Sequence, residues 1–305
     1  MVESDKNDST SNSTTVRELG NVSLQCPKLT DTNYTTWALM METIMKAYGI
    51  WNLKDLFIGS YGGKVFPNWI GDPSFLLLTC VQIRGCRKCT FLPPLGQLPS
   101  LKKLDIHSLN EVKVVGSEFL GTGIAFPKLE SLSFANMSGW EVWSTNSGVV
   151  DAVFPRLQTL EIVDCPNLVE VSFEALLPSM RVLHLDGSGD GVLTSLIHVA
   201  SAVTKLSIWS ISGLSDEVWR GVMDYLGAVE EVSIFECNEI RYMWESEAKA
   251  SKVLVRNLVS LGEKEEEDGS CNQLTSLRIL GLAACEESCA LQIAKQHSRI
   301  EYLLL

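Results

Sequence analysis

Two pairs of cysteines have spacings that occur in metal sites. Cys86 and Cys89 are separated by two residues, as in zinc knuckles, and Cys285 and Cys289 are separated by three. A structural zinc site needs four ligands. Cys86 and Cys285 also fall at a recurring position that has a packing role, described below. The sequence therefore predicts no metal site.

Two glycine-rich segments match nucleotide-binding loops only in part. Gly62-Gly63-Lys64 shares the end of a phosphate-binding loop, but Ile58 and Val65 stand where that loop needs glycine and serine or threonine. Gly187-Ser188-Gly189-Asp190-Gly191 lacks the strand–helix frame of a dinucleotide site and predicts a turn. We expect no nucleotide binding and no cofactor.

Catalytic residue types are scattered along the sequence. Four histidines fall in different repeats of the pattern described below: His107, His184, His198 and His297. No Ser-His-Asp order and no pair of carboxylates can be placed in one pocket. The sequence therefore indicates a protein that is not an enzyme.

Charge and hydropathy restrict the partners and the compartment. The net charge of −12 argues against nucleic acid or a membrane surface as a partner, since both require a basic face. The chain opens with no secretory signal, and no apolar run reaches the roughly 18 residues of a membrane span. Nine cysteines, an odd number, fit a reducing compartment. We expect a cytoplasmic protein.

The elements that would position these residues repeat from residue 52 onward. Each unit has an apolar residue, two free positions, an apolar residue, one free position and a third apolar residue. Successive first positions are 23 to 28 residues apart, except for one step of 48, where Val253 to Leu261 occupies a slot without a clean match. Ten units match, with first positions at Leu53, Leu78, Leu101, Leu129, Leu157, Met180, Val203, Val229, Leu277 and Ile300.

This period predicts an α/β repeat solenoid, the leucine-rich-repeat horseshoe, over residues 52–305. Alternation turns the apolar residues of each strand inward and leaves the others on a parallel concave sheet. Proline-bearing connections predict a mostly irregular convex side, with Ser215 to Leu226 as its best helix candidate. The charge run 263–268 indicates a solvated loop. A cysteine often closes the turn after the strand: Cys86, Cys165, Cys237 and Cys285.

The first 51 residues have a different character. Residues 1–26 are rich in Ser, Thr and Asn and predict a disordered N-terminus. Residues 27–51 predict one helix, capped by Asn33 or Thr35 and ended by Gly49. It is either a plain amphipathic helix or a cap on the open edge of the repeats. Its apolar face comprises Trp37, Met40, Met41, Ile44, Met45 and Tyr48, of which Trp37, Met41, Ile44 and Met45 are expected to pack on that edge.

Residues 52–305 resemble the repeat region of plant coiled-coil nucleotide-binding leucine-rich-repeat resistance proteins. The resemblance rests on YGGKVFPNWIGDP (residues 61–73), LPPLGQLPSLKKL (92–104), FPRL (154–157) and CPNL (165–168). It implies a recognition or autoinhibition surface in pathogen sensing. The coiled coil and the nucleotide-binding module of that class are not found in this sequence, and the slot near Val255 looks shortened against the family pattern.

Residues 27–51 resemble the start of a Copia-type retrotransposon capsid-like polyprotein. The resemblance rests on PKLTDTNYTTW (27–37), the Met-rich helix and YGIW (48–51). The remaining capsid helices are missing, which predicts a chimera with its junction near Trp51 and Asn52.

Three functions are compatible with this reading. The first is a protein-binding fragment of an immune receptor that lacks the nucleotide switch, with a pathogen effector, a guarded host protein or another receptor as its partner. The second is a non-functional remnant of a resistance gene fused to a retrotransposon. The third, a capsid-like assembly protein, is disfavoured by the missing capsid body. The sequence assigns no oligomeric state.

The outward position after each third apolar residue predicts the binding surface. These positions form one column: Gly59, Arg84, His107, Ala135, Val163, Asp186, Trp209, Phe235 and Ala283. Trp209 and Phe235 are consecutive, flanked one column over by Lys205 and Glu231 as a polar rim. Arg84, Lys103 and His107 extend the site. The alternative is that the two aromatic side chains pack on each other or under a convex insertion.

Overall fold

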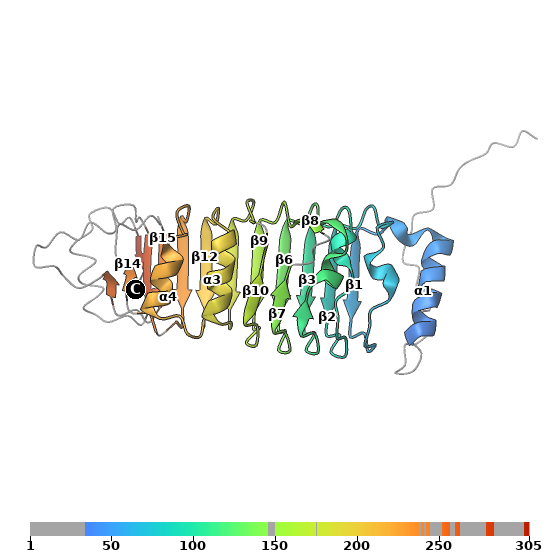
Figure 1. Ribbon diagram of the computed structural model, residues 1–305, viewed down its shortest axis with the longest axis horizontal. Coiled ribbons are helices and arrows are strands. Elements are labelled where there is room, and N and C mark those ends of the chain that lie inside the picture. The colour runs from blue at the N-terminus through green and yellow to red at the C-terminus, as the bar shows by residue number, and fades with distance from the viewer. Residues whose placement is uncertain are drawn as a thin grey trace, which may run out of the picture.

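The computed structural model describes residues 34–145, 150–174, 176–237, 239–240, 242–244, 252–256, 260–262, 279–283 and 302–304. Figure 1 shows an elongated stack of strands with a helix at its N-terminal end. The predicted disordered segment 1–26, the charge run 263–268 and Cys285 lie outside the described residues.

One parallel sheet of 11 strands runs the length of the stack in the order β1-β2-β3-β6-β9-β11-β12-β13-β15-β17-β18. The predicted repeats therefore form the predicted solenoid. The strands are β1 Asp55–Gly59, β2 Cys80–Arg84, β3 Lys103–His107, β6 Ser131–Ala135, β9 Thr159–Val163, β11 Val182–Asp186, β12 Lys205–Trp209, β13 Glu231–Phe235, β15 Lys252–Arg256, β17 Ile279–Ala283 and β18 Tyr302–Leu304.

The slot without a clean match is an ordinary repeat. Val253 pairs with Val232 and Val255 pairs with Ile234, so β15 has the same register as its neighbours. Only the first apolar position departs from the pattern, because Ala250 stands there. The expectation of an unmatched slot was therefore wrong: two of its three apolar positions are filled.

Alternating burial confirms which face of each strand points inward. In β3, β6, β9 and β11 the second and fourth residues are buried, and their neighbours are half-buried or exposed. Leu56 and Ile58 of β1 are only partly buried, because β1 is the edge strand of the sheet. The inward residues of all these repeats share one continuous core.

Helices and short strands form the side opposite the main sheet. Figure 1 shows α3 (Asp190–Val199) and α4 (Asp216–Met223) running alongside the strands of the main sheet. The expected helix near Ser215 is confirmed, since the Ser215 hydroxyl caps α4 by accepting from the Val218 amide. Two proline-bearing connections form 3₁₀ helices, η2 Asn68–Gly71 after Pro67 and η3 Leu95–Gln97 after Pro94. A third 3₁₀ helix, η1 Ile50–Asn52, follows α1.

The convex side contains more regular secondary structure than the sequence predicted. A second parallel sheet joins β4 (Val114–Val115), β7 (Val142–Ser144) and β10 (Glu170–Ser172). The remaining elements are α2 Ser117–Leu120 and the strand pairs β5 Gly123–Ala125 with β8 Val150–Val153 and β14 Tyr242–Trp244 with β16 Ser260–Gly262.

The glycine-rich segment 187–191 also differs from the prediction. It connects β11 directly to α3, so the strand–helix frame that we expected to be missing is present. Its geometry does not favour phosphate. Asp190 stands in the first turn of α3, and the Asp164 carboxylate lies 3.2 Å from where a Cβ on Gly187 would stand. Two carboxylates repel an anion at this helix N-terminus.

Aromatic rings fill the middle of the core. Phe134 is fully buried, with its ring centroid 4.6 Å from that of Trp140 and 5.4 Å from that of Trp143. Nearby, η3 approaches α2 so closely that a Cβ on Gly96 would lie 2.1 Å from the Leu120 carbonyl oxygen. The glycine of the LPPLGQLP phrase is therefore required by packing.

The N-terminal helix α1 spans Tyr34–Tyr48 and ends at Gly49, whose φ is +62°. Met41 packs against the repeat core, as expected, and Ile44 is half-buried. Met40, placed on the apolar face by the pattern, is instead 43% exposed. Thr35 lies inside the helix and cannot be its N-cap. Asn33 and the side chains of Trp37 and Met45 lie outside the described residues.

Candidate functional site

The predicted column of outward residues exists on the concave sheet. In-register pairing places Arg84 beside His107, Asp186 beside Trp209, and Trp209 beside Phe235. One member was missed: Arg256 of β15 pairs with Ala283, so Ala283 does not directly follow Phe235. The cause is the unrecognised repeat.

Trp209 and Phe235 pack on each other. Their ring centroids are 4.6 Å apart at an interplanar angle of 42°. This is the arrangement expected if the pair only stabilises the sheet, yet Trp209 keeps 38% of its surface exposed and Phe235 is half-buried. The pair therefore presents a joint aromatic surface on the concave face, where β12 and β13 end.

Lys205 and Glu231 form an ion pair, with 3.0 Å between Nζ and Oε2. They pair across β12 and β13, but Ser207 and Ser233 lie between them and the aromatic pair. The ion pair is thus two columns from Trp209, and the expectation of one column was wrong. Side chains alternate along a strand, so four residues correspond to two outward positions.

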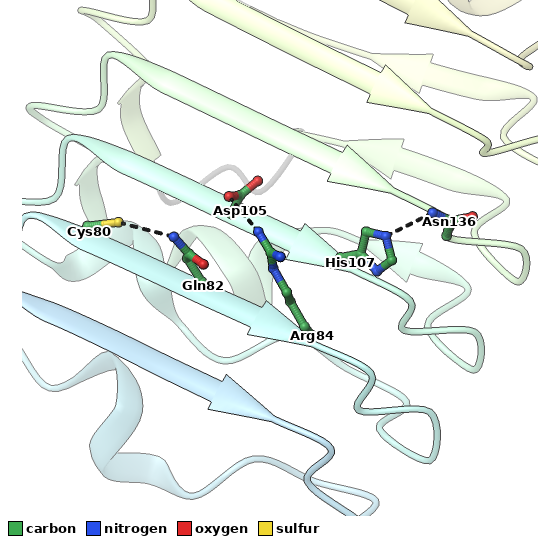
Figure 2. A network of polar contacts seen from close by, with 6 residues as sticks. All are labelled: Cys80, Gln82, Arg84, Asp105, His107 and Asn136. Atoms are coloured by element: carbon green, nitrogen blue, oxygen red, sulfur yellow. Dashed lines mark hydrogen bonds and ion pairs between the residues drawn. The ribbon is translucent and has the colours of Figure 1, made fainter.

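Arg84, Lys103 and His107 form a second group on β2 and β3. Arg84 reaches across to Asp105, with 3.4 Å between Nη2 and Oδ2, as Figure 2 shows. Lys103 is exposed at the other end of β3. Because β6, β9 and β11 separate β3 from β12, this group lies roughly 19 Å from the aromatic pair. The structure does not bring the two predicted groups together.

Hydrogen bonds on both ring nitrogens fix the orientation of His107. The Asn136 amide nitrogen lies 2.9 Å from Nε2, and the Ser108 hydroxyl oxygen lies 2.7 Å from Nδ1 (Figure 2 shows the Asn136 contact). An amide nitrogen can only donate, so with the Asn136 amide in this orientation Nε2 accepts and Nδ1 carries the proton that it donates to Ser108. In this tautomer the imidazole cannot take the Ser108 proton, so the trio is not an activated nucleophile.

A feature missed by sequence reasoning lies where each strand ends. The residue after each of eight strands has a φ between +47° and +68°. The amide nitrogens of the first seven donate to the last carbonyl of the next strand. We call these eight residues the rim: Ser60, Gly85, Ser108, Asn136, Asp164, Gly187, Ser210 and Glu236. These eight positions share one backbone conformation but carry five different residue types, so the sequence shows no recurring residue that would have predicted the rim.

An open groove of about 620 Å³ runs along the rim. Hydrogen bonds organise its floor: the Asn110 amide donates to the Ser138 hydroxyl at 2.7 Å, and the Asn167 amide donates to the Ser138 carbonyl at 2.7 Å. The groove is lined by Arg87, Ser108, Asn110, Glu111, Asn136, Ser138, Asp164, Pro166 and Gly187. Most of these residues have polar side chains, so the groove can form hydrogen bonds with a ligand.

Carboxylates gather at the end of the groove nearest the aromatic pair. Burial raises the pKa of Asp186, and the negative charges of Asp164 and Glu236 raise it further, although His184 opposes them. Like charges close together disfavour ionisation. The concave face is therefore acidic where β9, β11 and β13 end.

The recurring cysteines have the packing role that the repeat predicts. The thiols of Cys86, Cys165 and Cys237 are buried, and each donates to the carbonyl two residues earlier, at 3.4 to 3.6 Å. Burial raises the pKa of Cys165 to about 12, and burial likewise raises the pKa of Cys89 to about 12.

Over the described part of the chain, no three His, Cys, Asp or Glu side chains are grouped as metal ligands. There too, no helix is long and apolar enough to cross a bilayer.

Sequence comparison identifies the repeats. A family described as R13L1/DRL21 LRRs matches residues 40–109, in agreement with the parallel sheet. The chain folds as a leucine-rich-repeat solenoid. The family match begins inside α1 and so spans both sides of the expected junction at residues 51 and 52. That junction and the retrotransposon resemblance remain predictions.

The solenoid is similar to plant disease resistance proteins. A putative disease resistance protein of Arabidopsis thaliana is 40% identical over 136 residues, covering 43% of this chain and 10% of the relative. The putative disease resistance RPP13-like protein 1 of the same plant is 29% identical over 203 residues, covering 62% and 18%. The putative disease resistance protein RGA4 of Solanum bulbocastanum is 30% identical over 162 residues, covering 52% and 16%. The matches thus span less than a fifth of each of these relatives.

Proposed function

We propose that this solenoid recognises a protein in plant immune signalling, through its concave face. Its partner would be a pathogen effector, a guarded host protein or another immune receptor. The similarity to disease resistance proteins supports a role in plant immune signalling. The observation that carries the proposal is the joint surface of Trp209 and Phe235, because partly exposed aromatic side chains beside polar groups are frequent hot spots of protein interfaces.

The remaining concave residues supply complementarity in this proposal. Lys205 and Glu231 form an ion pair at the start of β12 and β13. Arg84, Lys103 and His107 present positive charge and hydrogen-bonding groups on β2 and β3. Exposed ion pairs contribute little to affinity by themselves. In this proposal the charged residues select partners by charge, while Trp209 and Phe235 supply most of the binding energy.

We also propose that the chain acts in the cytoplasm, without catalysis. The locked imidazole of His107 and the raised pKa of the buried thiols support the second point. The chimeric origin is a separate proposal that rests on residues 27–37 and 48–51. Full-length transcript sequencing across Trp51 and Asn52 tests it, and transcripts without that junction would exclude a fusion.

A double substitution tests the recognition surface. Trp209→Ala with Phe235→Ala should abolish capture of partner proteins that the unmodified chain retains from plant extract, measured by quantitative mass spectrometry. Tyr225→Ala is the matched control, because Tyr225 is an aromatic residue of similar exposure, 46%, that packs against His198 away from the main sheet. It should leave capture unchanged.

Thermal unfolding of the same variants separates binding from folding. Loss of an aromatic cross-strand pair should cost on the order of 1 kcal/mol, so the double variant should still melt cooperatively. If it does not fold, the pair belongs to the core and the proposed surface is wrong. Retention of all partners by a folded double variant would equally contradict the proposal.

A further inference from the structure

The two ends of the rim groove carry opposite charges. Arg87 lies at the β2 end, where it is exposed and forms no ion pair within the described residues. Arg84 is close by in sequence and half of its side chain is exposed, although it also contacts Asp105. This end of the groove therefore offers a cation that the fold itself does not use.

The other end combines carboxylates with an aromatic face. Asp164 lines the groove beside Gly187, and the Gly187 amide donates to the Trp209 carbonyl at 3.1 Å. Asp186 pairs in register with Trp209. A cationic side chain placed here would relieve the repulsion between Asp164 and Asp186 that raises the pKa of Asp186, and it would lie against the exposed surface of Trp209.

Between these ends the groove is lined by hydrogen-bonding groups and by one further carboxylate, that of Glu111. Ser108, Asn110, Asn136 and Ser138 line it, and they provide hydroxyl and amide groups at the level of successive strands. Such groups suit the amides and carbonyls of an extended backbone that crosses the strand ends. The carboxylates of Glu111 and Asp164 would repel nucleic acid.

We propose that the rim groove binds an extended polypeptide segment that places a basic side chain on Trp209, Asp186 and Asp164 and an acidic side chain on Arg87. The proposal rests on the proposed protein-binding function and names the chemistry of the partner. Five strand steps separate β2 from β12, which is about 24 Å. An extended chain covers about 3.3 Å per residue, so the two charges lie about seven residues apart. Arginine is favoured over lysine, since its planar guanidinium both stacks on indole and pairs with a carboxylate.

Selection from a random peptide library tests this geometry. Phage-displayed peptides of about twelve residues, long enough to span the groove, are selected on the full chain and on an Arg87→Glu variant. Lys128→Glu is the matched control, because Lys128 is exposed just before β6, at the opposite strand ends from the rim. The unmodified chain and the control should enrich peptides with a basic and an acidic residue about seven positions apart. Arg87→Glu should enrich peptides with basic residues at both positions.

Affinities of synthetic versions of the enriched peptides complete the test. Alanine in place of the acidic residue should weaken binding to the unmodified chain about tenfold, as for loss of a charge pair, and should not weaken binding to Arg87→Glu. Alanine in place of the basic residue should weaken binding to the unmodified chain and not to Asp186→Asn with Trp209→Ala.

Three results overturn the inference: no enriched peptide, enriched peptides without the charge spacing, or enrichment unaffected by Arg87→Glu. If one of these occurs while the Trp209 and Phe235 double variant still loses its natural partner, only the groove assignment fails. If that variant also keeps every partner, the proposed function fails with it.

Discussion

Phe134→Ala should divide the solenoid into two separately stable parts. Phe134 lies in β6, near the middle of the main sheet, and is fully buried. Each repeat of a solenoid contacts mainly its neighbours, so stability is close to a sum of repeat and interface contributions. Removing this ring weakens the contacts of β6 with β3 and β9 and leaves the distant repeats intact.

The expected loss is about 5 kcal/mol. Truncation of a buried Phe to Ala costs roughly 3–5 kcal/mol. Phe134 should be at the upper limit because its ring contacts three others, with centroids 4.6 Å (Trp140), 5.4 Å (Trp143) and 6.2 Å (Phe119) away. Each such aromatic contact adds about 0.5–1.5 kcal/mol beyond the buried area.

Hydrogen–deuterium exchange with mass spectrometry can locate this loss. Protection should fall by roughly 3.5 orders of magnitude in β3, β6 and β9, since each 1.4 kcal/mol is tenfold. It should fall much less in β1 and β12. Denaturant unfolding should change from one transition to two.

Phe57→Ala is the control, because it makes the same chemical change on the concave face of β1, where Phe57 is 64% exposed. It should cost less than about 1 kcal/mol. A uniform loss of protection along the whole sheet after Phe134→Ala, or a cost similar to that of Phe57→Ala, would refute the nearest-neighbour reasoning.

Three more predictions concern a rim carboxylate, a close-packed glycine and the buried thiols. The pKa of Asp186 is raised in the folded state, so ionisation of this group lowers stability above its folded pKa and has no cost below its unfolded pKa. Asp186→Asn should therefore raise the melting temperature near about pH 7 and not below about pH 3; an equal gain at both values, seen by circular dichroism, argues against it. Gly96→Ala should cost roughly 3 kcal/mol or more in denaturant unfolding, because its Cβ would lie 2.1 Å from the Leu120 carbonyl oxygen. Gly189→Ala, with ordinary φ and open space around it, should cost less than about 1 kcal/mol. With a pKa of about 12, Cys165 should resist iodoacetamide in the folded chain near about pH 8, whereas half-exposed Cys80 should react. Equal labelling of both, measured by mass spectrometry, would show that Cys165 is not buried.

The repeat pattern predicted the main sheet because burial selects residue types strongly. Leu104 and Ile106 of β3 are inaccessible to water, and the same positions are apolar in each neighbouring strand. The pairing of Trp209 with Phe235 followed from that register alone. The slot near Val253 was missed because Ala250, which takes the first apolar position, is too small to be recognised as part of the pattern.

The rim could not be predicted in the same way. Its positions require a left-handed backbone, which Ser60, Asn136 and Glu236 all adopt. Their side chains face water, so packing does not select one type. Helix α3 was missed for a related reason: Gly187 and Gly189 indicate a turn, and the helix begins directly after them.

The in-register pairing of the main sheet makes the distance between binding groups adjustable in whole steps. Arg87 lies in the turn after β2 and Trp209 ends β12, and every intervening strand adds about 4.8 Å between them. Duplication of one repeat in the gene would insert a strand without disturbing its neighbours. The recognised segment would then have to be longer by one or two residues, with the same charges at its ends. Deletion of a repeat would shorten the recognised segment equally. The number of repeats between the two binding groups therefore sets the length of the segment that can bind.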